Sequence, residues 1–170
     1  TGARTDGRDL TAEWTAKSEN HVYITDKAGF DAVDFASDAR VLGLFEPSHM
    51  KFALDRSEDP AGEPSLVDLT RAAITRLSQD EDGYVLLVEG GRIDHGHHGV
   101  SAARALSETD EFDQAVAAAL EMTKADETLI IVTADHSHTM TISGYPKRGN
   151  PILGKVVSGL GNAPMDAHDG

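Results

Sequence analysis

The sequence contains no cysteine among its 170 residues, which excludes disulfide bonds and thiolate chemistry. It has no apolar run near the roughly 20 residues that a membrane-spanning helix needs. No basic segment with a following apolar one opens the chain, so we expect no signal peptide in these residues. Basic residues are few, with 15 Lys and Arg against 29 Asp and Glu, for a formal charge of −14. Because such a surface repels nucleic-acid backbones and anionic membranes, we expect neither as a partner.

Helices and strands are predicted to alternate along the chain. The apolar runs at 84–88 and 128–133 lack polar alternation, which is typical of strands buried on both faces. Such strands, separated by helices, predict an α/β fold, a parallel sheet with helices on both faces, as one partial domain over residues 1–170. Helices are expected at 10–19, 27–35, from Ser65 as a cap onward and at 101–124, and strands at 21–25, 40–45, 84–88 and 128–133.

Two stretches are expected to lack regular structure. Residues 46–63 are charged and contain Pro47, Pro60 and Gly62, which predicts a long acidic loop. Residues 144–170 are rich in glycine and proline, and we predict an irregular, incomplete tail there.

Acidic side chains directly follow the two most apolar predicted strands. Glu89 follows 84–88 and Asp135 follows 128–133. Because the carboxyl ends of parallel strands meet at one edge of a sheet, both carboxylates are expected in one crevice. Five of the eight histidines lie in the same two segments: His95, His97, His98, His136 and His138.

The spacing of these residues suits divalent cations. Asp94 and His98 are four positions apart, so a single helical turn would place both on one face. Asp135 and His136 are adjacent and can present an oxygen and a nitrogen to a second ion. Mixed Asp and His ligands suit zinc, and Glu89 among oxygen ligands suits magnesium. The alternative is a surface histidine cluster that binds no metal.

Several segments resemble the alkaline phosphatase family. The residues VEGGRIDHGHH at 88–98 and TADHSH at 133–138 are similar to its two metal-binding segments. GLFEP at 43–47, GYPKRG at 144–149 and the opening GxxxDGRxLTAEW pattern at 2–14 are also similar. The resemblance implies a three-layer sandwich of sheet and helices, of which this chain holds only part.

The resemblance also implies a role for each residue of these segments. Asp94 and His98 would bind a zinc ion that activates water, while Asp135 and His136 would bind the zinc ion that holds a serine nucleophile. Glu89 would bind magnesium. The remaining three histidines would not be primary ligands: His138 would support the carboxylate of Asp94, and His95 and His97 would only lie near the metals.

Other parts of the family's site have no match in this chain. The nucleophilic serine, the aspartate before it, the phosphate-binding arginine and a third zinc histidine are missing, so no catalytic residue is assigned. Ser101 precedes a predicted helix and is interpreted as its N-cap, and His168 lacks the family's context. We therefore interpret the chain as an internal fragment.

A calcium site is a further expectation from the resemblance. The Phe45 carbonyl, Glu46 and Glu63 match the calcium-binding loop of animal relatives, and a solvated acidic loop is the alternative.

The metal-ligand pattern predicts a two-metal phosphate-ester hydrolase. The resemblance implies that it is a phosphate monoester hydrolase with two zinc ions and one magnesium ion, acting through a phosphoserine intermediate on small phosphate monoesters. The resemblance implies a homodimer in the periplasm or outside the cell. Two alternatives stay open: a catalytically inactive metal-binding fragment, and a related phosphodiesterase, mutase or sulfatase.

Overall fold

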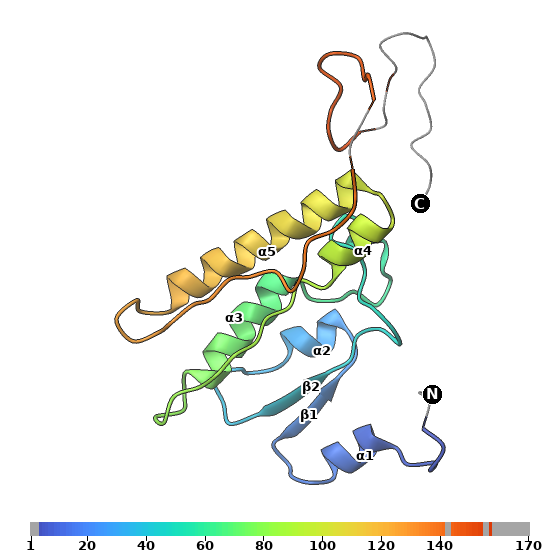
Figure 1. Cartoon of the computed structure of the whole chain (residues 1–170). Coiled ribbons are helices and arrows are strands. Elements are labelled where there is room, and N and C mark those ends of the chain that lie inside the picture. Colours follow the sequence, from blue (N-terminus) through green and yellow to red (C-terminus); the bar gives the residue numbers. More distant parts are fainter. Residues whose placement is uncertain (1–3, 142–143, 155–156, 158–170) are drawn as a thin grey trace.

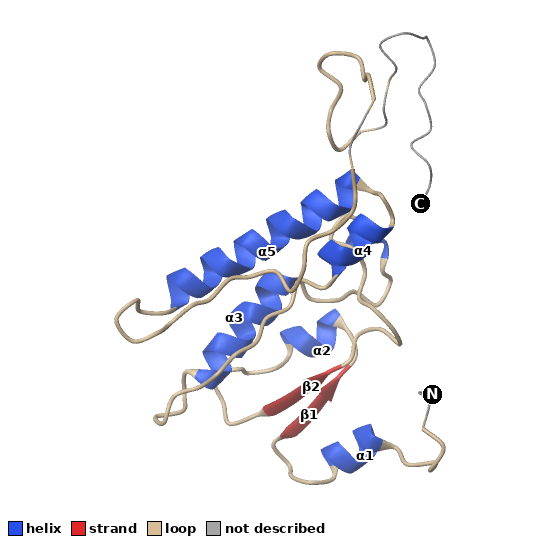
Figure 2. Cartoon of the chain, in the orientation of Figure 1, coloured by secondary structure: helices blue, strands red, loops and turns tan. Residues whose placement is uncertain are grey.

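Helices and strands alternate over the residues that the structure, a computed structural model, describes: 4–141, 144–154 and 157 (Figures 1 and 2). His168 and most of the predicted tail lie outside these residues. None of the described helices is long and apolar enough to cross a membrane. The elements are α1 (Leu10–Thr15), β1 (His21–Ile24), α2 (Lys27–Asp31), β2 (Arg40–Gly43), the 3-10 turn η1 (Arg56–Glu58), α3 (Leu66–Leu77), α4 (Arg92–His98) and α5 (Ala102–Met122).

Strands β1 and β2 pair in parallel, with a register that runs from His21 opposite Arg40 to Ile24 opposite Gly43. Helix α2 connects them, as a parallel pair requires. A small apolar core lies beside this pair and α3. It contains Ile24, Phe30 and Ala72, with partly buried Val22, Val33, Phe35, Val41, Phe45 and Leu69 packed against them. The predicted α/β class with a parallel sheet, present in part, is confirmed.

Helices α3 and α5 begin directly after the capping residues that the sequence indicates. Ser65 Oγ accepts the Asp68 N–H at 3.0 Å, and the Asp68 carboxylate accepts the Ser65 N–H at 3.1 Å, which completes a capping box for α3. Ser101 Oγ accepts the Arg104 N–H at the start of α5, so its prediction as an N-cap is confirmed.

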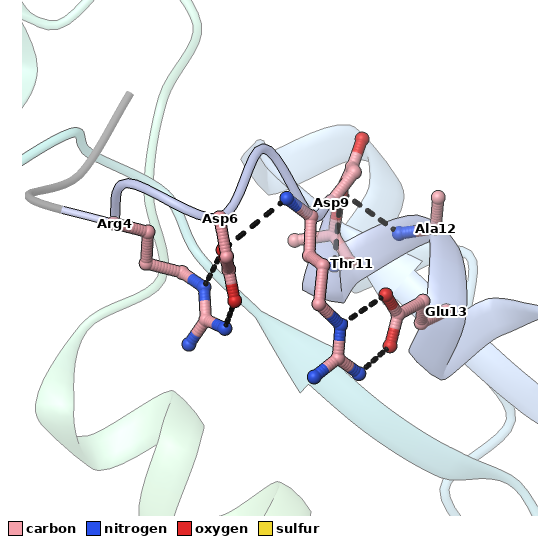
Figure 3. A network of polar contacts seen from close by, with 7 residues as sticks. Arg4, Asp6, Asp9, Thr11, Ala12 and Glu13 are labelled. Atoms are coloured by element: carbon pink, nitrogen blue, oxygen red, sulfur yellow. Dashed lines mark hydrogen bonds and ion pairs between the residues drawn. The ribbon is translucent and has the colours of Figure 1, made fainter.

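Helix α1 is capped by Asp9, whose carboxylate accepts the N–H groups of Thr11 and Ala12 at 3.0 Å (Figure 3). Arg8 forms an ion pair with Glu13 in the first turn. The predicted helix at 10–19 is too long, because α1 ends at Thr15 in a turn. Similarly, α2 ends at Asp31 and not at residue 35.

The prediction of strands at 84–88 and 128–133 is wrong for the described residues. Both segments lie along α3 and α5 as irregular chain without a paired neighbour (Figure 1). A strand is defined by its partner, and the only paired strands in the described part are β1 and β2. The expected burial on both faces is also wrong for these segments, because every second residue is exposed, with Val85 at 96% and Leu129 at 84%.

Helices α4 and α5 approach each other closely at Gly96. A Cβ atom on Gly96 would lie 2.7 Å from the Ala105 nitrogen and 2.8 Å from its Cα. The turn between them closes with the Val100 N–H on the His97 carbonyl at 2.9 Å and the Ser101 N–H on the Gly96 carbonyl at 3.0 Å. This Schellman-type turn usually places glycine where Val100 adopts a φ of 52°, a strained conformation for a β-branched residue.

The loop at 46–63 is fastened to the helices by carboxylates. Glu108 of α5 accepts the Ala53 N–H, and Glu111 pairs with Arg56 at 2.6 Å. Burial raises the pKa of Glu108. The Phe52 ring lies under two guanidinium groups, 3.7 Å from Arg92 and 4.7 Å from Arg104. The middle of the loop, from Phe52 to Arg56, therefore contacts α4 and α5.

Candidate metal centre

Helix α4 places Asp94 and His98 on one face, one turn apart. The His98 Nε2 atom lies 3.3 Å from Asp94 Oδ2. The predicted helical turn is confirmed, because both residues belong to a helix of seven residues. Glycine at 96 permits the helix to lie against α5, which in turn sets where this face points.

His138 joins this pair from a distant segment. Its Nε2 atom lies 3.9 Å from Asp94 Oδ1, and its Nδ1 atom accepts the Met140 N–H at 3.1 Å. The neutral imidazole therefore carries its proton on Nε2, facing the carboxylate. We call Asp94, His98 and His138 the Asp94 cluster, since one potential ligand atom from each lies within 4.8 Å of the others. Asp94 Oδ1 is buried and has no hydrogen-bond partner.

Asp135 and His136 form a second pair on the extended segment before His138. Their Oδ2 and Nε2 atoms are 3.3 Å apart, and both side chains are exposed. His136 Nδ1 donates to the Ser137 carbonyl at 2.9 Å, and this bond, with the Asp135 carboxylate, raises the pKa of His136. In the neutral ring, this bond leaves Nε2 as the nitrogen with a free lone pair, the atom that binds a metal in many sites.

Glu89 lies at the start of the turn into α4. A Cβ atom on Gly91 would lie 3.1 Å from Glu89 Oε1, so the glycine leaves room for the carboxylate. Within the part of the chain that the structure describes, neither Glu89 nor the Asp135–His136 pair belongs to the Asp94 cluster. The structure thus brings together three of the predicted residues, Asp94, His98 and His138. Glu89, Asp135 and His136 lie outside this cluster.

His95 and His97 lie outside the Asp94 cluster. His97 Nδ1 donates to the Ile93 carbonyl at 2.7 Å. His95 packs against His49 with ring centroids 4.3 Å apart, and its Nδ1 atom lies 3.2 Å from an Arg92 guanidinium nitrogen. Burial lowers the pKa of His95. Sequence reasoning missed His49, which sits in the 46–63 loop without a motif around it.

A separate acidic cluster lies at the base of the loop. One carboxylate oxygen each from Glu46, Asp59 and Glu63 lies within 4.8 Å of the others. Glu63 is 3% exposed, burial raises its pKa, and its Oε2 atom has no hydrogen-bond partner. Lys51 contacts Glu46 at 3.0 Å and donates its backbone N–H to Glu63. Asp59 was not predicted, and only its place in the acidic loop pointed to it.

Known proteins match this chain over nearly all its length. The alkaline phosphatase family model matches residues 1–163. The membrane-bound alkaline phosphatase of Bombyx mori is 44% identical over 161 residues, which cover 92% of this chain and 29% of that protein. The tissue-nonspecific isozyme of Mus musculus is 42% identical over 171 residues, covering 98% and 32%.

A solved structure has the same fold in part. The cold-active alkaline phosphatase of Shewanella sp. superposes with a TM-score of 0.57 at 30% identity, covering 71% of this chain and 28% of that one. The present chain thus spans less than a third of the length of the relatives it matches. Because the family model matches 163 of its 170 residues, the chain belongs to the alkaline phosphatase family.

Proposed function

We propose that this chain is the metal-binding part of a phosphate monoester hydrolase that uses a phosphoserine intermediate. The Asp94 cluster carries the proposal, because it joins a carboxylate and two imidazoles from distant segments within 4.8 Å. In a protein of charge −14, bound cations would also supply the positive field that a phosphate requires. Family membership supports the same reaction class.

The residues fit zinc and magnesium in their donor chemistry. Asp94 and His98 would hold one zinc ion, Asp135 and His136 the second, and Glu89 a magnesium ion, while His138 would orient Asp94. The buried, unpartnered Asp94 Oδ1 is the type of atom that a cation satisfies. When bound, zinc ions polarise a phosphoryl group and stabilise charge on its attacking and leaving oxygens.

The other groups that the reaction requires would lie in a longer protein that contains these 170 residues. We propose that its other segments supply the serine, the phosphate-binding arginine and the third zinc histidine. Small phosphate monoesters as substrates, a homodimer and a periplasmic or extracellular location are proposed on family membership alone. The isolated 170 residues, by the same reasoning, are catalytically inactive.

The choice of ester tests the reaction class. In the longer protein, kcat/KM for p-nitrophenyl phosphate should exceed that for bis-p-nitrophenyl phosphate and p-nitrophenyl sulfate by about 100-fold or more, roughly 2.7 kcal/mol of barrier. The monoester dianion places more charge on the cations than the diester or sulfate does. The isolated chain with zinc and magnesium is the control and should show no turnover. A preference for the diester would contradict the proposal.

We also propose that the acidic cluster of Glu46, Asp59 and Glu63 binds calcium. Glu46 and Glu63, with the Phe45 carbonyl, were expected as ligands, and Asp59 adds a third carboxylate oxygen. Calcium takes six to eight oxygen ligands in flexible geometry, which a loop can supply. The buried Glu63 Oε2 without a partner supports this proposal, because desolvating a carboxylate is costly unless a cation compensates it.

Calcium should therefore raise the melting temperature of the chain. At a free calcium concentration of 100 times the dissociation constant, binding raises the free energy of unfolding by about 2.7 kcal/mol. This corresponds to a rise in melting temperature of roughly 5–10 °C for a chain of this size. Differential scanning fluorimetry with zinc and magnesium held in excess would measure the shift. Glu63→Gln should abolish it, while Glu58→Gln, an exposed carboxylate in the same loop, should leave it unchanged. An equal shift in Glu63→Gln would argue against the site.

A further inference from the structure

The Phe52 ring joins three segments of the chain. It belongs to the loop at 46–63, which Figure 1 shows passing beside α4 near the beginning of α5. The ring centroid lies 3.7 Å from the guanidinium carbon of Arg92, at the start of α4, and 4.7 Å from that of Arg104, in the first turn of α5. An arginine within about 6 Å of an aromatic face is attracted by the quadrupole of the ring. The ring therefore connects the loop to both helices.

Helix α5 fixes the part of the loop that carries this ring. The buried Glu108 accepts the N–H of Ala53, the residue after Phe52. Arg104 pairs with Asp55 at 3.1 Å, so the arginine that contacts the ring also holds the loop three positions later. The position of the ring is thus set by α5.

The guanidinium of Arg92 depends on this ring for a partner. Its Nη1 atom donates to His95 Nδ1 at 3.2 Å, which fastens it to the next turn of α4. Its Nε atom is buried and has no hydrogen-bond partner in the described part of the chain. Because a buried polar atom without a partner costs free energy, contact with the face of Phe52 offsets part of that cost. The ring thereby holds the first residue of α4 against the loop.

Helix α4 is held at two points, and a metal ligand lies between them. One point is Arg92 on the Phe52 ring, and the other is the close approach of Gly96 to Ala105 of α5. Asp94 stands between these points in a helix of only seven residues. If the first contact were lost, the helix could pivot about Gly96, and the Asp94 carboxylate would move.

We propose that Phe52 is a positioning residue for the Asp94 cluster. Through Arg92, it fixes the first turn of α4 and so the place of the Asp94 carboxylate relative to His138, which comes from a distant segment. An aliphatic side chain could fill the same space but has no quadrupole to hold a guanidinium. The inference rests on the proposed function, because it concerns the placement of a zinc ligand.

Zinc affinity in the longer protein tests this role. Phe52→Leu should weaken binding of the zinc ion that His98→Ala removes by about 10- to 100-fold, the range for residues that orient a metal ligand. Phe52→Tyr keeps the ring and should stay within about threefold of the wild type. The matched control is Phe30→Leu, which removes a ring from the apolar core around Ile24 and should lower the melting temperature without changing zinc affinity. Competition with a chromophoric chelator would measure the dissociation constants.

A double variant tests whether the ring acts through Arg92. Arg92→Met removes the guanidinium, keeps an unbranched stem and should weaken zinc binding as much as Phe52→Leu does. Because both substitutions remove the same contact, the double variant should bind zinc within about threefold of Arg92→Met alone. Arg92→Met also tests the role if Phe52→Leu does not fold.

Amide hydrogen exchange in the metal-free longer protein gives a measure that does not depend on zinc. The amides at 96–99 should exchange about 10-fold or more faster in Phe52→Leu than in the wild type, and those of α5 should be unchanged. Phe52→Tyr should restore the slow exchange. Protected α5 amides would show that each variant is folded.

Three results would overturn the inference: unchanged exchange at 96–99 in Phe52→Leu, multiplied losses of zinc affinity in the double variant, or an equal loss in Phe30→Leu. Unchanged zinc affinity in Phe52→Leu would overturn it as well, in a protein that binds zinc through His98. A protein that loses no zinc in His98→Ala would instead contradict the proposed function, and exchange at 96–99 would still decide whether Phe52 places α4.

Discussion

Replacing His98 with alanine in the longer protein should lower kcat/KM for p-nitrophenyl phosphate by about 1,000-fold or more, roughly 4 kcal/mol of barrier. One equivalent of zinc should be lost as well. The reason is geometric: His98 Nε2 lies 3.3 Å from Asp94 Oδ2, so the pair presents two donor atoms to one ion. Steady-state kinetics and metal analysis by mass spectrometry would measure both losses.

His97→Ala is the matched control, because it removes the same imidazole from the neighbouring position. Its Nδ1 atom donates to the Ile93 carbonyl, and the ring is not in the Asp94 cluster. Activity should fall less than about 10-fold. His138→Ala should lie between the two, with a loss of about 10- to 100-fold typical of residues that orient a ligand. Equal losses for His97 and His98 would mean that the ligand assignment is off by one position.

Replacing Gly96 with alanine should destabilise the protein by about 1–3 kcal/mol, although alanine favours helices. The added Cβ would lie 2.7 Å from the Ala105 nitrogen, so one of the two helices must move. Because α4 carries Asp94 and His98, that movement displaces two donor atoms together. A misplacement near 1 Å can cost about 100-fold in rate, and we expect a loss of that order in kcat/KM.

Urea unfolding and zinc titration would separate the two effects of Gly96→Ala. Ala117→Leu adds a larger group to an exposed position of α5 and should change stability by less than about 0.5 kcal/mol. If Gly96→Ala matched this control in stability and zinc affinity, the close approach of the two helices would have no role in the site.

The parallel α/β class and the first strands were predictable, since β1 and β2 lie close to each other in sequence and pair through α2. Helix starts were predictable where a side chain makes the cap, as at Ser65 and Ser101. Helix ends were not, because Thr15 and Asp31 are followed by residues with no strong stop signal. The apolar segments at 84–88 and 128–133 have a strand's pattern, yet pairing depends on a neighbouring strand, which the pattern of one segment does not specify.

The candidate site was predictable where ligands share an element. Asp94 and His98 are four positions apart, so the helix period alone brings them together. The approach of His138 to Asp94 depends on the path of the chain between α5 and residue 138, and the family resemblance suggested it where spacing did not. Asp59 and His49 were missed because a loop has no period from which a contact can be calculated.

The unpaired segments at 84–88 and 128–133 have a consequence for aggregation. Val85, Leu87, Leu129 and Ile131 are exposed on segments that have no paired neighbour in the described residues, and such apolar segments can template the association of copies into aggregates. The high acidic charge opposes such nonspecific encounters within about a Debye length of 8 Å at the ionic strength of a cell. The acidic surface therefore disfavours nonspecific aggregation through these exposed apolar segments.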